Sequence, residues 1–455
     1  RALIESAAPA LRDAPPVQQR LAQIELRAGE YEAVERRLLA LIDRLSSPGD
    51  AALRARALIT LASAYVRRDQ FDKADEAYNE AIASRGDVQD PEVLGIAYLG
   101  RGIVLAEKGR FDDAVAELGR ARIELETSGD PLGVAQVDVN LGDFQAMRHR
   151  PADALPMLQT AARRFGELGA REGLVYALIG VAAMQRELLD PVAALATTDR
   201  FWPPETSTNN PRMRWKATLA RAQALAANGR LGDSDALVAK IRTESDPGKD
   251  AALRAQNEAV AAGIAMRHGE PAEAARLAGI ALTPALRDSD KTLYTRTLLL
   301  EATALQAGAE PKRAAASAER LRSFAAESGD DWIELQAAIA GAGQAWAENR
   351  RDAALQGYAV ALQQAAQLAI PDDLVAAGAP YAGALIEVGH IDEARSVAGR
   401  IAPWADRDPR AAWTQVRLFR ALGREDAEQQ ARIVAVHLAG EGRLPEAVRD
   451  TATAR

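Results

Sequence analysis

The chain has 455 residues, of which 48% are hydrophobic, a formal net charge of −8 and no cysteine. The acidic balance disfavours direct nucleic-acid binding through a broad basic face. The lack of cysteine excludes disulfides, thiolate metal sites and cysteine nucleophiles. No run of about eighteen apolar residues occurs, so we predict no membrane span and expect a soluble chain, in the cytoplasm ahead of the periplasm.

Residues 1–12 are predicted to be the tail of a preceding helix or an N-terminal cap. A 40-residue repeat then runs through residues 13–404 without an insertion. Its clearest mark is a small residue in the middle of the first predicted helix of each repeat, which lets helix backbones approach closely. The ten positions hold Ala22, Ala62, Gly102, Gly142, Ala182, Ala222, Ala262, Ala302, Ala342 and Ala382. This regularity predicts a repeat architecture.

Helix boundaries follow the same register. Twelve residues before the central small residue, most repeats carry a side chain suited to capping the first backbone N–H groups. These residues are Asp50, Asp90, Asp130, Asn210, Asp250, Asp290 and Asp330. The turns between paired helices share a glycine at Gly29, Gly109, Gly229, Gly269 and Gly389. Neither helix could bury its apolar stripe alone, so we predict helix pairs that stack and share a core.

The small and aromatic residues of repeats 2 and 3 resemble the tetratricopeptide repeat. The residues that carry the resemblance are Ala62, Tyr65, Phe71, Ala74, Tyr78 and Ala81, then Gly102, Leu105, Gly109, Phe111, Ala114, Leu118 and Ala121. It implies an all-α fold, a right-handed α-solenoid or superhelix of about ten antiparallel helix pairs with a C-terminal cap. The period differs from the usual 34 and is similar to variants in the C-terminal sensor or scaffold regions of bacterial multidomain regulators. HEAT or armadillo repeats also fit such a period, although the tight Gly-x-Phe turn argues against them.

The register breaks after Trp404. Residues 405–440 are predicted to form an atypical C-terminal capping helix pair, and residues 441–455 a frayed tail. The polar, proline-rich stretch 202–211 is predicted to be a long linker, with a hinge or lid as the alternative. Because the chain begins with Arg1, we expect either a fragment of a longer protein or a mature chain.

Catalytic motifs are missing from the sequence, including those of nucleotide-binding loops, serine hydrolases and zinc proteases. His149, His268 and His390 fall in or beside inter-helix turns of repeats 4, 7 and 10, too far apart along a solenoid to share a metal. We expect them to face solvent in structural roles. The sequence therefore predicts a binding protein with no catalytic residue, metal or cofactor, while fold and chemistry remain separable.

The resemblance also implies a concave groove lined by the first helices. We predict that ten inward positions form its partner-binding surface: Leu99, Ile103, Val139, Asp143, Tyr176, Ile179, Arg186, Lys216, Gln223 and Trp346. Apolar pockets with scattered polar groups suit an extended or helical peptide. The alternative is that part of this apolar row is inter-helix core.

The functional hypothesis is a protein-protein interaction or sensor region of a larger bacterial signalling or transcription-regulatory protein. Its partner would be a protein or peptide, and an attached winged-helix or kinase effector domain is expected outside this chain. The second hypothesis is a self-associating assembly scaffold without a groove ligand. For this region we expect no direct nucleic-acid binding, no membrane span, and a monomer or weak homo-oligomer.

Overall fold

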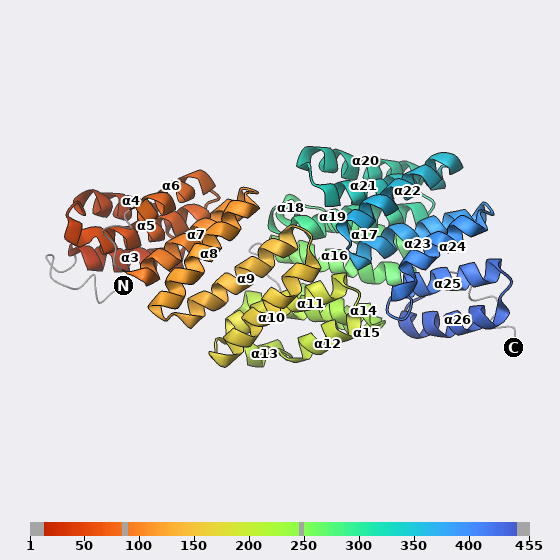
Figure 1. Ribbon diagram of the computed structural model, residues 1–455, viewed down its shortest axis with the longest axis horizontal. Coiled ribbons are helices and arrows are strands. Elements are labelled where there is room, and N and C mark those ends of the chain that lie inside the picture. The colour runs from red at the N-terminus through yellow and green to blue at the C-terminus, as the bar shows by residue number, and fades with distance from the viewer. Residues whose placement is uncertain (1–12, 84–89, 245–249, 444–455) are drawn as a thin grey trace. The chain divides into compact units, whose positions relative to one another are not determined.

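The computed structural model describes residues 13–83, 90–244 and 250–443, and helices account for all the regular structure in these ranges. Figure 1 labels the 24 α-helices that they contain, α3 to α26, which are joined by short turns. The predicted N-terminal element, residues 1–12, lies outside the described residues, as does most of the predicted frayed tail. The all-helical fold class predicted from the 40-residue register is confirmed.

Two compact bodies share the chain. The N-terminal body includes residues up to Phe144 and Pro156–Leu174, and the C-terminal body includes Gln145–Leu155 and residues from Val175 onward. The helices of the first three repeats are α3 (Pro15–Ala28), α4 (Tyr31–Arg44), α5 (Ala51–Val66), α6 (Phe71–Ala83), α7 (Pro91–Glu107) and α8 (Phe111–Ser128). Three helices contribute residues to both bodies: α9 (Pro131–Met147), α10 (Pro151–Glu167) and α11 (Arg171–Glu187).

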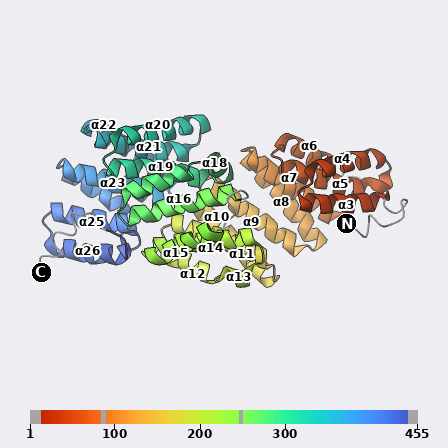
Figure 2. The same ribbon diagram turned by 180° about the vertical axis from the view of Figure 1, so that it is seen from behind.

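The C-terminal body continues the same alternation of first and second helices. Repeats 5 to 7 are completed by α12 (Pro191–Asp199), α13 (Pro204–Ser207), α14 (Pro211–Ala227), α15 (Leu231–Glu244), α16 (Ala251–Arg267), α17 (Pro271–Ala281) and α18 (Pro284–Ser289). Repeats 8 to 10 contain α19 (Lys291–Ala307), α20 (Pro311–Ser328), α21 (Asp331–Ala347), α22 (Arg351–Leu368), α23 (Pro371–Glu387) and α24 (Ile391–Ile401). The pair α25 (Pro409–Ala421) and α26 (Glu425–Ala439) follows, and both views show it side by side (Figure 1, Figure 2).

The central small residues are the points of closest packing. Ala22, Ala62, Ala222 and Ala302 are fully buried, and a Cβ on Gly102 would lie 3.1 Å from Cδ2 of Leu118 in the paired second helix. A Cβ on Gly142 would lie only 2.7 Å from Cγ of Leu158 in the paired second helix. The repeated small residue therefore sets how closely each first helix packs against its partner.

Helix ends match the predicted caps at most positions. The carboxylates of Asp90, Asp290 and Asp330 accept hydrogen bonds from backbone N–H groups of the first turn, whereas Asp50 and Asp250 make no such bond. All five turn glycines have positive φ, between 73° and 83°. In five other repeats the same left-handed position holds Asp69, His149, Leu189, Ala309 or Asn349, with φ between 55° and 59°.

The stretch 202–211 and the chain end each add local structure. The peptide bond between Trp202 and Pro203 is cis, and α13 interrupts the predicted linker. Beyond α26, the Glu441 N–H donates to the Gly229 carbonyl at 2.9 Å and the Arg443 N–H to the Arg267 carbonyl at 3.0 Å. Among the described residues, the helices are too short or too polar to cross a membrane.

Candidate functional site

First helices leave one face uncovered by neighbouring helices. In α7, exposed or half-buried residues recur at Glu92, Ile96, Gly100, Ile103 and Glu107, which is the spacing of one helix face. The same register positions define what we call the first-helix face in every repeat. In the C-terminal body, polar members of this face include Lys216, Gln223, Arg267, Arg296, Trp332, Asp372 and Glu187.

Ion pairs connect distant repeats across this face of the C-terminal body. Arg296 of α19 pairs with Asp372 of α23 at 2.6 Å and with Glu187 of α11 at 3.5 Å. Asp372 also pairs with Arg410 at 2.6 Å, and Arg410 with Asp408 at 2.9 Å. Repeat 9 lies between Arg296 and Asp372 in sequence, so their contact requires the face to curve inward.

Burial and the neighbouring charges shift the pKa of Asp372 in opposite directions. Burial alone would raise the pKa of its carboxyl, but the guanidinium groups of Arg410 and Arg296 outweigh burial and hold that pKa well below its ordinary range. Burial of Glu187 is the larger effect, and it raises the pKa of that carboxyl despite Arg296. The network is therefore anchored by an ionised Asp372 between two arginines.

Trp332 joins this network to the turn of repeat 4. Its side chain is 1% exposed, and its Nε1–H donates to Oδ2 of Asp373 at 2.8 Å while Gln336 donates to Oδ1 at 3.0 Å. The ring of His149 stacks on Trp332 with centroids 4.1 Å apart, and His149 lies 3.6 Å from Asp330. The expectation that this histidine faces solvent is wrong, because its left-handed turn places the ring against Trp332.

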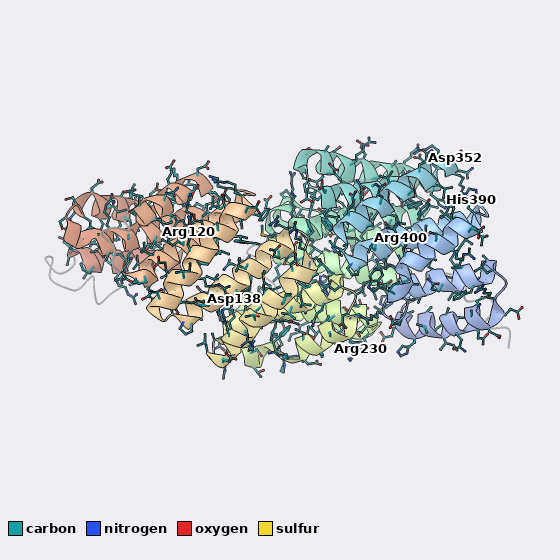
Figure 3. All side chains as sticks on the ribbon, viewed as in Figure 1. Arg120, Asp138, Arg230, Asp352, His390 and Arg400 are labelled. Carbon is teal, nitrogen blue, oxygen red and sulfur yellow. The ribbon has the colours of Figure 1, made fainter. Side chains whose placement is uncertain are left out.

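The other turn histidines differ from His149. The side chains of His268 and His390 are 29% and 52% exposed. Figure 3 shows His390 and Arg230 on the outer surface of the C-terminal body. In the part of the chain that the structure describes, no three histidine or acidic side chains come together in a way that could hold a metal ion.

The ten predicted groove residues occupy different environments. Leu99 and Val139 are 8% and 7% exposed and pack in the core, whereas Tyr176 is 40% exposed. Lys216 is also exposed, and the half-buried residues are Ile103, Asp143, Ile179, Arg186, Gln223 and Trp346. Leu99, Ile103, Val139 and Asp143 belong to the N-terminal body and the other six to the C-terminal body. Lys216 and Gln223 therefore hold positions of the first-helix face, whereas Arg186 corresponds to Ala106 and lies one residue before the face position of Glu187.

Sequence reasoning missed the network around Arg296, Asp372 and Trp332. These residues hold first-helix-face positions of repeats 8, 10 and 9, so their register was readable. Nothing in the register indicates which repeats meet across a curved face. Charged residues also stand at these register positions in other repeats, such as Arg56, Glu92 and Arg212, so the sequence carries no signal that singles out this network.

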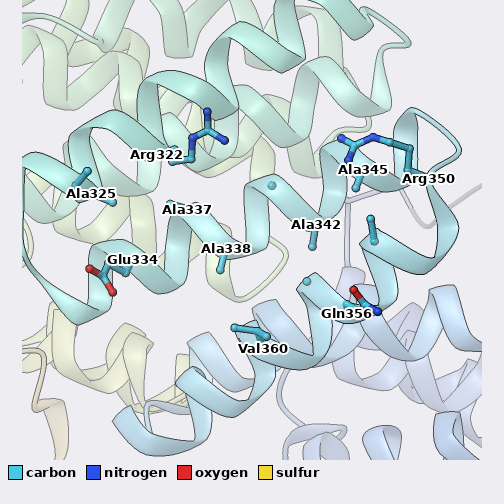
Figure 4. Close-up of a pocket in the computed structure, with 14 residues that line it drawn as sticks. Arg322, Ala325, Glu334, Ala337, Ala338, Ala342, Ala345, Arg350, Gln356 and Val360 are labelled. Atoms are coloured by element: carbon cyan, nitrogen blue, oxygen red, sulfur yellow. The ribbon is translucent and has the colours of Figure 1, made fainter.

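A separate apolar groove of about 640 Å³ lies over α21, between α20 and α22 (Figure 4). Its floor is Ala338, Gly341 and Ala345. The corresponding residues of repeat 3 are Tyr98, Arg101 and Leu105, and there the Arg101 guanidinium bridges Asp75 and Glu117 of the flanking second helices. Small residues at these three positions therefore leave the groove open in repeat 9.

Comparison with solved structures identifies the architecture. The chain is similar to a signal transduction ATPase with numerous domains that carries a tetratricopeptide repeat sensor, from Pyrococcus horikoshii, at 15% identity and a TM-score of 0.50. The match covers 63% of this chain and 43% of that protein, so this chain corresponds to less than half of its length. This chain has the tetratricopeptide-repeat fold.

Two further tetratricopeptide-like structures align over most of this chain. A Rap protein in complex with competence and sporulation factor matches at 11% identity and a TM-score of 0.48, over 86% of this chain and 97% of that one. The apo quorum sensor NprR from B. thuringiensis matches at 13% identity and a TM-score of 0.47, over 85% and 97%. No protein-family model and no curated protein sequence matches this tetratricopeptide-repeat chain.

Proposed function

We propose that this chain is the sensor region of a larger bacterial signalling or transcription-regulatory protein. Its first-helix face in the C-terminal body captures a peptide or protein segment. The observation that carries the proposal is that this face runs through repeats 5 to 10 and is curved by the Arg296–Asp372 and Arg296–Glu187 pairs. The tetratricopeptide repeat sensor of the Pyrococcus horikoshii protein supports the same role for this fold.

Binding would combine apolar contact with polar orientation. Tyr176 presents an exposed ring, and Lys216 and Gln223 offer hydrogen-bond donors on the adjoining helix. A peptide side chain packed on the ring contributes apolar burial, while the polar side chains fix the direction of the peptide. These three residues hold face positions of repeats 5 and 6, which follow one another in the chain.

The test is a Gly263→Arg variant, compared with Gly399→Arg. Gly263 lies on the first-helix face of α16, and a Cβ built there meets nothing within 4 Å, so arginine enters the face without a core clash. Gly399 has equally open surroundings on the second helix α24. We expect Gly263→Arg to abolish recovery of the partner from source lysate and Gly399→Arg to preserve it, with equal helicity by circular dichroism. Equal recovery with both variants would refute binding at this face.

Self-association is the second candidate, and one observation favours it. The helix α26 exposes Ile433, Val434 and Val436, which are 59%, 37% and 50% exposed. Three neighbouring apolar side chains on a helix surface are a typical contact for a second copy. Light scattering from 1 to 100 μM tests this: a concentration-dependent rise in mass that Ile433→Glu removes supports it, and a constant monomer mass refutes it.

A further inference from the structure

Repeat 9 differs from the other repeats at two positions that face the space between consecutive second helices. Gly341 of α21 and Gly357 of α22 hold these positions, and none of the other nine repeats has glycine at either of them. In repeat 3 they are Arg101 and Glu117, whose side chains pair at 3.0 Å. The missing side chains therefore explain why the apolar groove over α21 is open in this repeat.

The groove has a basic wall and opposite charges at its two ends. Figure 4 shows Glu334 at one end and Arg350 at the other, with the apolar floor between them. The wall α20 carries four basic and two acidic residues, and one of the basic residues, Arg322, lines the groove. Arg322 and Arg350 each pair with a nearby surface glutamate. Such exposed pairs contribute little, and each guanidinium keeps donors for a further carboxylate.

The outward face of α26 has the complementary pattern. Asp426, Ile433 and His437 follow one another along its exposed side, at spacings that place residues on one helix face. Val434 and Val436 flank Ile433 and are exposed as well. The helix has three acidic residues in its first turn and a single arginine. Its acidic end and apolar centre therefore match the basic wall and apolar floor of the groove.

These two surfaces do not meet within one chain. The opposite side of α26 packs against α25 through Ala431, Ala435 and Leu438, and no residue of α26 lines the groove. Residues 440–443 hold the end of α26 at the turns of repeats 6 and 7. Exposed apolar side chains gain free energy when they leave water, and a floor of alanine and glycine lets a helix approach closely. A second copy of the chain supplies the missing partner for both surfaces.

We propose that α26 of one copy docks into the groove over α21 of a second copy. The proposal rests on self-association, the second candidate function, and names its partner surface. Ile433 enters the groove above Gly341, and Asp426 faces Arg350, so that α26 runs antiparallel to α21. The two contacting surfaces differ, so a dimer keeps one free groove and one free α26 face. Copies therefore add head to tail, into a ring or an open chain.

The first experiment is light scattering of the full chain from 1 to 100 μM. We expect the weight-average mass of the wild type to rise at least about twofold, as for a contact that dissociates near about 100 μM. Gly341→Gln places a neutral side chain on the groove floor, where a Cβ meets nothing within 4 Å, and should hold the mass at that of the monomer. Gly399→Gln, with equally open surroundings on α24, is the matched control and should associate like the wild type.

Mixing two variants separates a head-to-tail contact from a symmetric one. Gly341→Gln blocks the groove and keeps α26 intact, whereas Ile433→Glu does the reverse. Equal amounts of the two variants should form a dimer and nothing larger, because only one pair of intact surfaces remains. A mixture that stays monomeric would overturn the proposal.

Exchanging charges tests the direction of the docked helix. Asp426→Arg should weaken association about threefold, and Arg350→Asp in the same chain should restore most of it, because the exchanged charges pair between copies. Both residues lie on the surface, so these variants leave the core unchanged. A double variant as weak as Asp426→Arg alone would overturn the placement of Asp426 at Arg350.

The outcomes also separate this interface from self-association in general. If Ile433→Glu abolishes association and Gly341→Gln leaves it unchanged, the chain self-associates through α26 without the groove, and the proposal is overturned. A constant monomer mass of the wild type would overturn both. Circular dichroism of each variant checks that helicity is equal. Partner recovery with Gly263→Arg, which tests the sensor function, is measured independently.

Discussion

At the residue scale, the free space beside a glycine decides whether a larger residue would fit at that position. Gly142 and Gly341 both lie in first helices, yet their surroundings differ. A Cβ on Gly142 would meet Leu158, which is 1% exposed, whereas a Cβ on Gly341 meets nothing within 4 Å. The first glycine is required for close helix packing, and the second is only a flexible residue on the floor of the groove over α21.

This contrast predicts opposite effects of the same substitution. Gly341→Ala should raise the free energy of unfolding by about 0.5–1 kcal/mol, since alanine favours the helix and has room. Gly142→Ala should lower it by about 1–3 kcal/mol through the clash with Leu158. Urea unfolding followed by circular dichroism measures both. A destabilising Gly341→Ala would show that the space over α21 is filled in solution.

Asp372 gives the network a defined dependence on pH. Its pKa in the folded chain is held below the ordinary aspartate value of about 3.9 that applies to the unfolded chain. Because the pKa of Asp372 is lower in the folded chain, its ionised carboxylate stabilises the fold fully above about pH 5. This contribution is lost as pH falls toward the pKa of the folded chain. Acid therefore weakens the contact between repeats 8 and 10.

Asp372→Asn should lower the free energy of unfolding by about 3 kcal/mol at pH 7, because it leaves two arginines without their shared carboxylate. The difference from the wild type should stay constant between pH 8 and pH 6 and shrink below about pH 4. Asp352→Asn, at an exposed carboxylate of α22 (Figure 3), is the control and should have almost no effect. A difference that is unchanged at pH 3 would contradict this account.

At the scale of elements, each first helix ends at a turn residue with a positive φ, and the type of this residue varies among the repeats. Five repeats end their first helix with glycine at a positive φ, and five use another residue at the same position. Only glycine adopts this left-handed conformation without steric strain. At His149 and Leu189 the strain is offset by contacts, because His149 stacks on Trp332 and Leu189 packs with Val375.

Asp69 shows no comparable compensation, and its carboxylate raises the pKa of Glu107 in addition to the larger effect of burial. Asp69→Gly should therefore raise the free energy of unfolding by about 0.5–1 kcal/mol, by relieving both the backbone strain and the repulsion. Leu189→Gly is the matched opposite: it should be destabilising because a side chain that is 6% exposed leaves the core. Thermal unfolding of the two variants checks the contrast, and a loss of stability in both would refute it.

The segment after α26 acts at the scale of the C-terminal body. Glu441 accepts from the Gly232 N–H at 2.5 Å, and its own N–H donates to the Gly229 carbonyl. Glycine at 229 and 440 permits this approach, since a Cβ on Gly440 would lie 2.6 Å from the Gly229 carbonyl oxygen. Residues 440–443 therefore tie the cap to the turns of repeats 6 and 7.

A chain that ends at Ala439 should lose this tie. We expect faster amide hydrogen exchange at Gly232, by about tenfold, because its acceptor is gone and local opening costs less free energy. Exchange in repeats 2 and 3 should stay unchanged and serves as the internal control. Unaltered exchange at Gly232 in the truncated chain would contradict the role assigned to residues 440–443.

The sequence by itself determined the helical repeats, their boundaries and most of their caps. Small residues at position 142, N-caps such as Asp90 and turn glycines such as Gly109 act within one helix pair, so a 40-residue register carries them. The same register placed Lys216 and Gln223 on the first-helix face. It could not separate Leu99 and Val139, which are core, from truly accessible positions, because burial depends on the neighbouring repeat.

Tertiary structure alone decided which repeats meet. The small rotation between successive repeats accumulates, and no single repeat records its sum. That sum brings Arg296 to Asp372 and Glu187, and His149 to Trp332 across more than four repeats. These contacts are therefore a property of curvature, whereas the helices that carry them are a property of the sequence pattern.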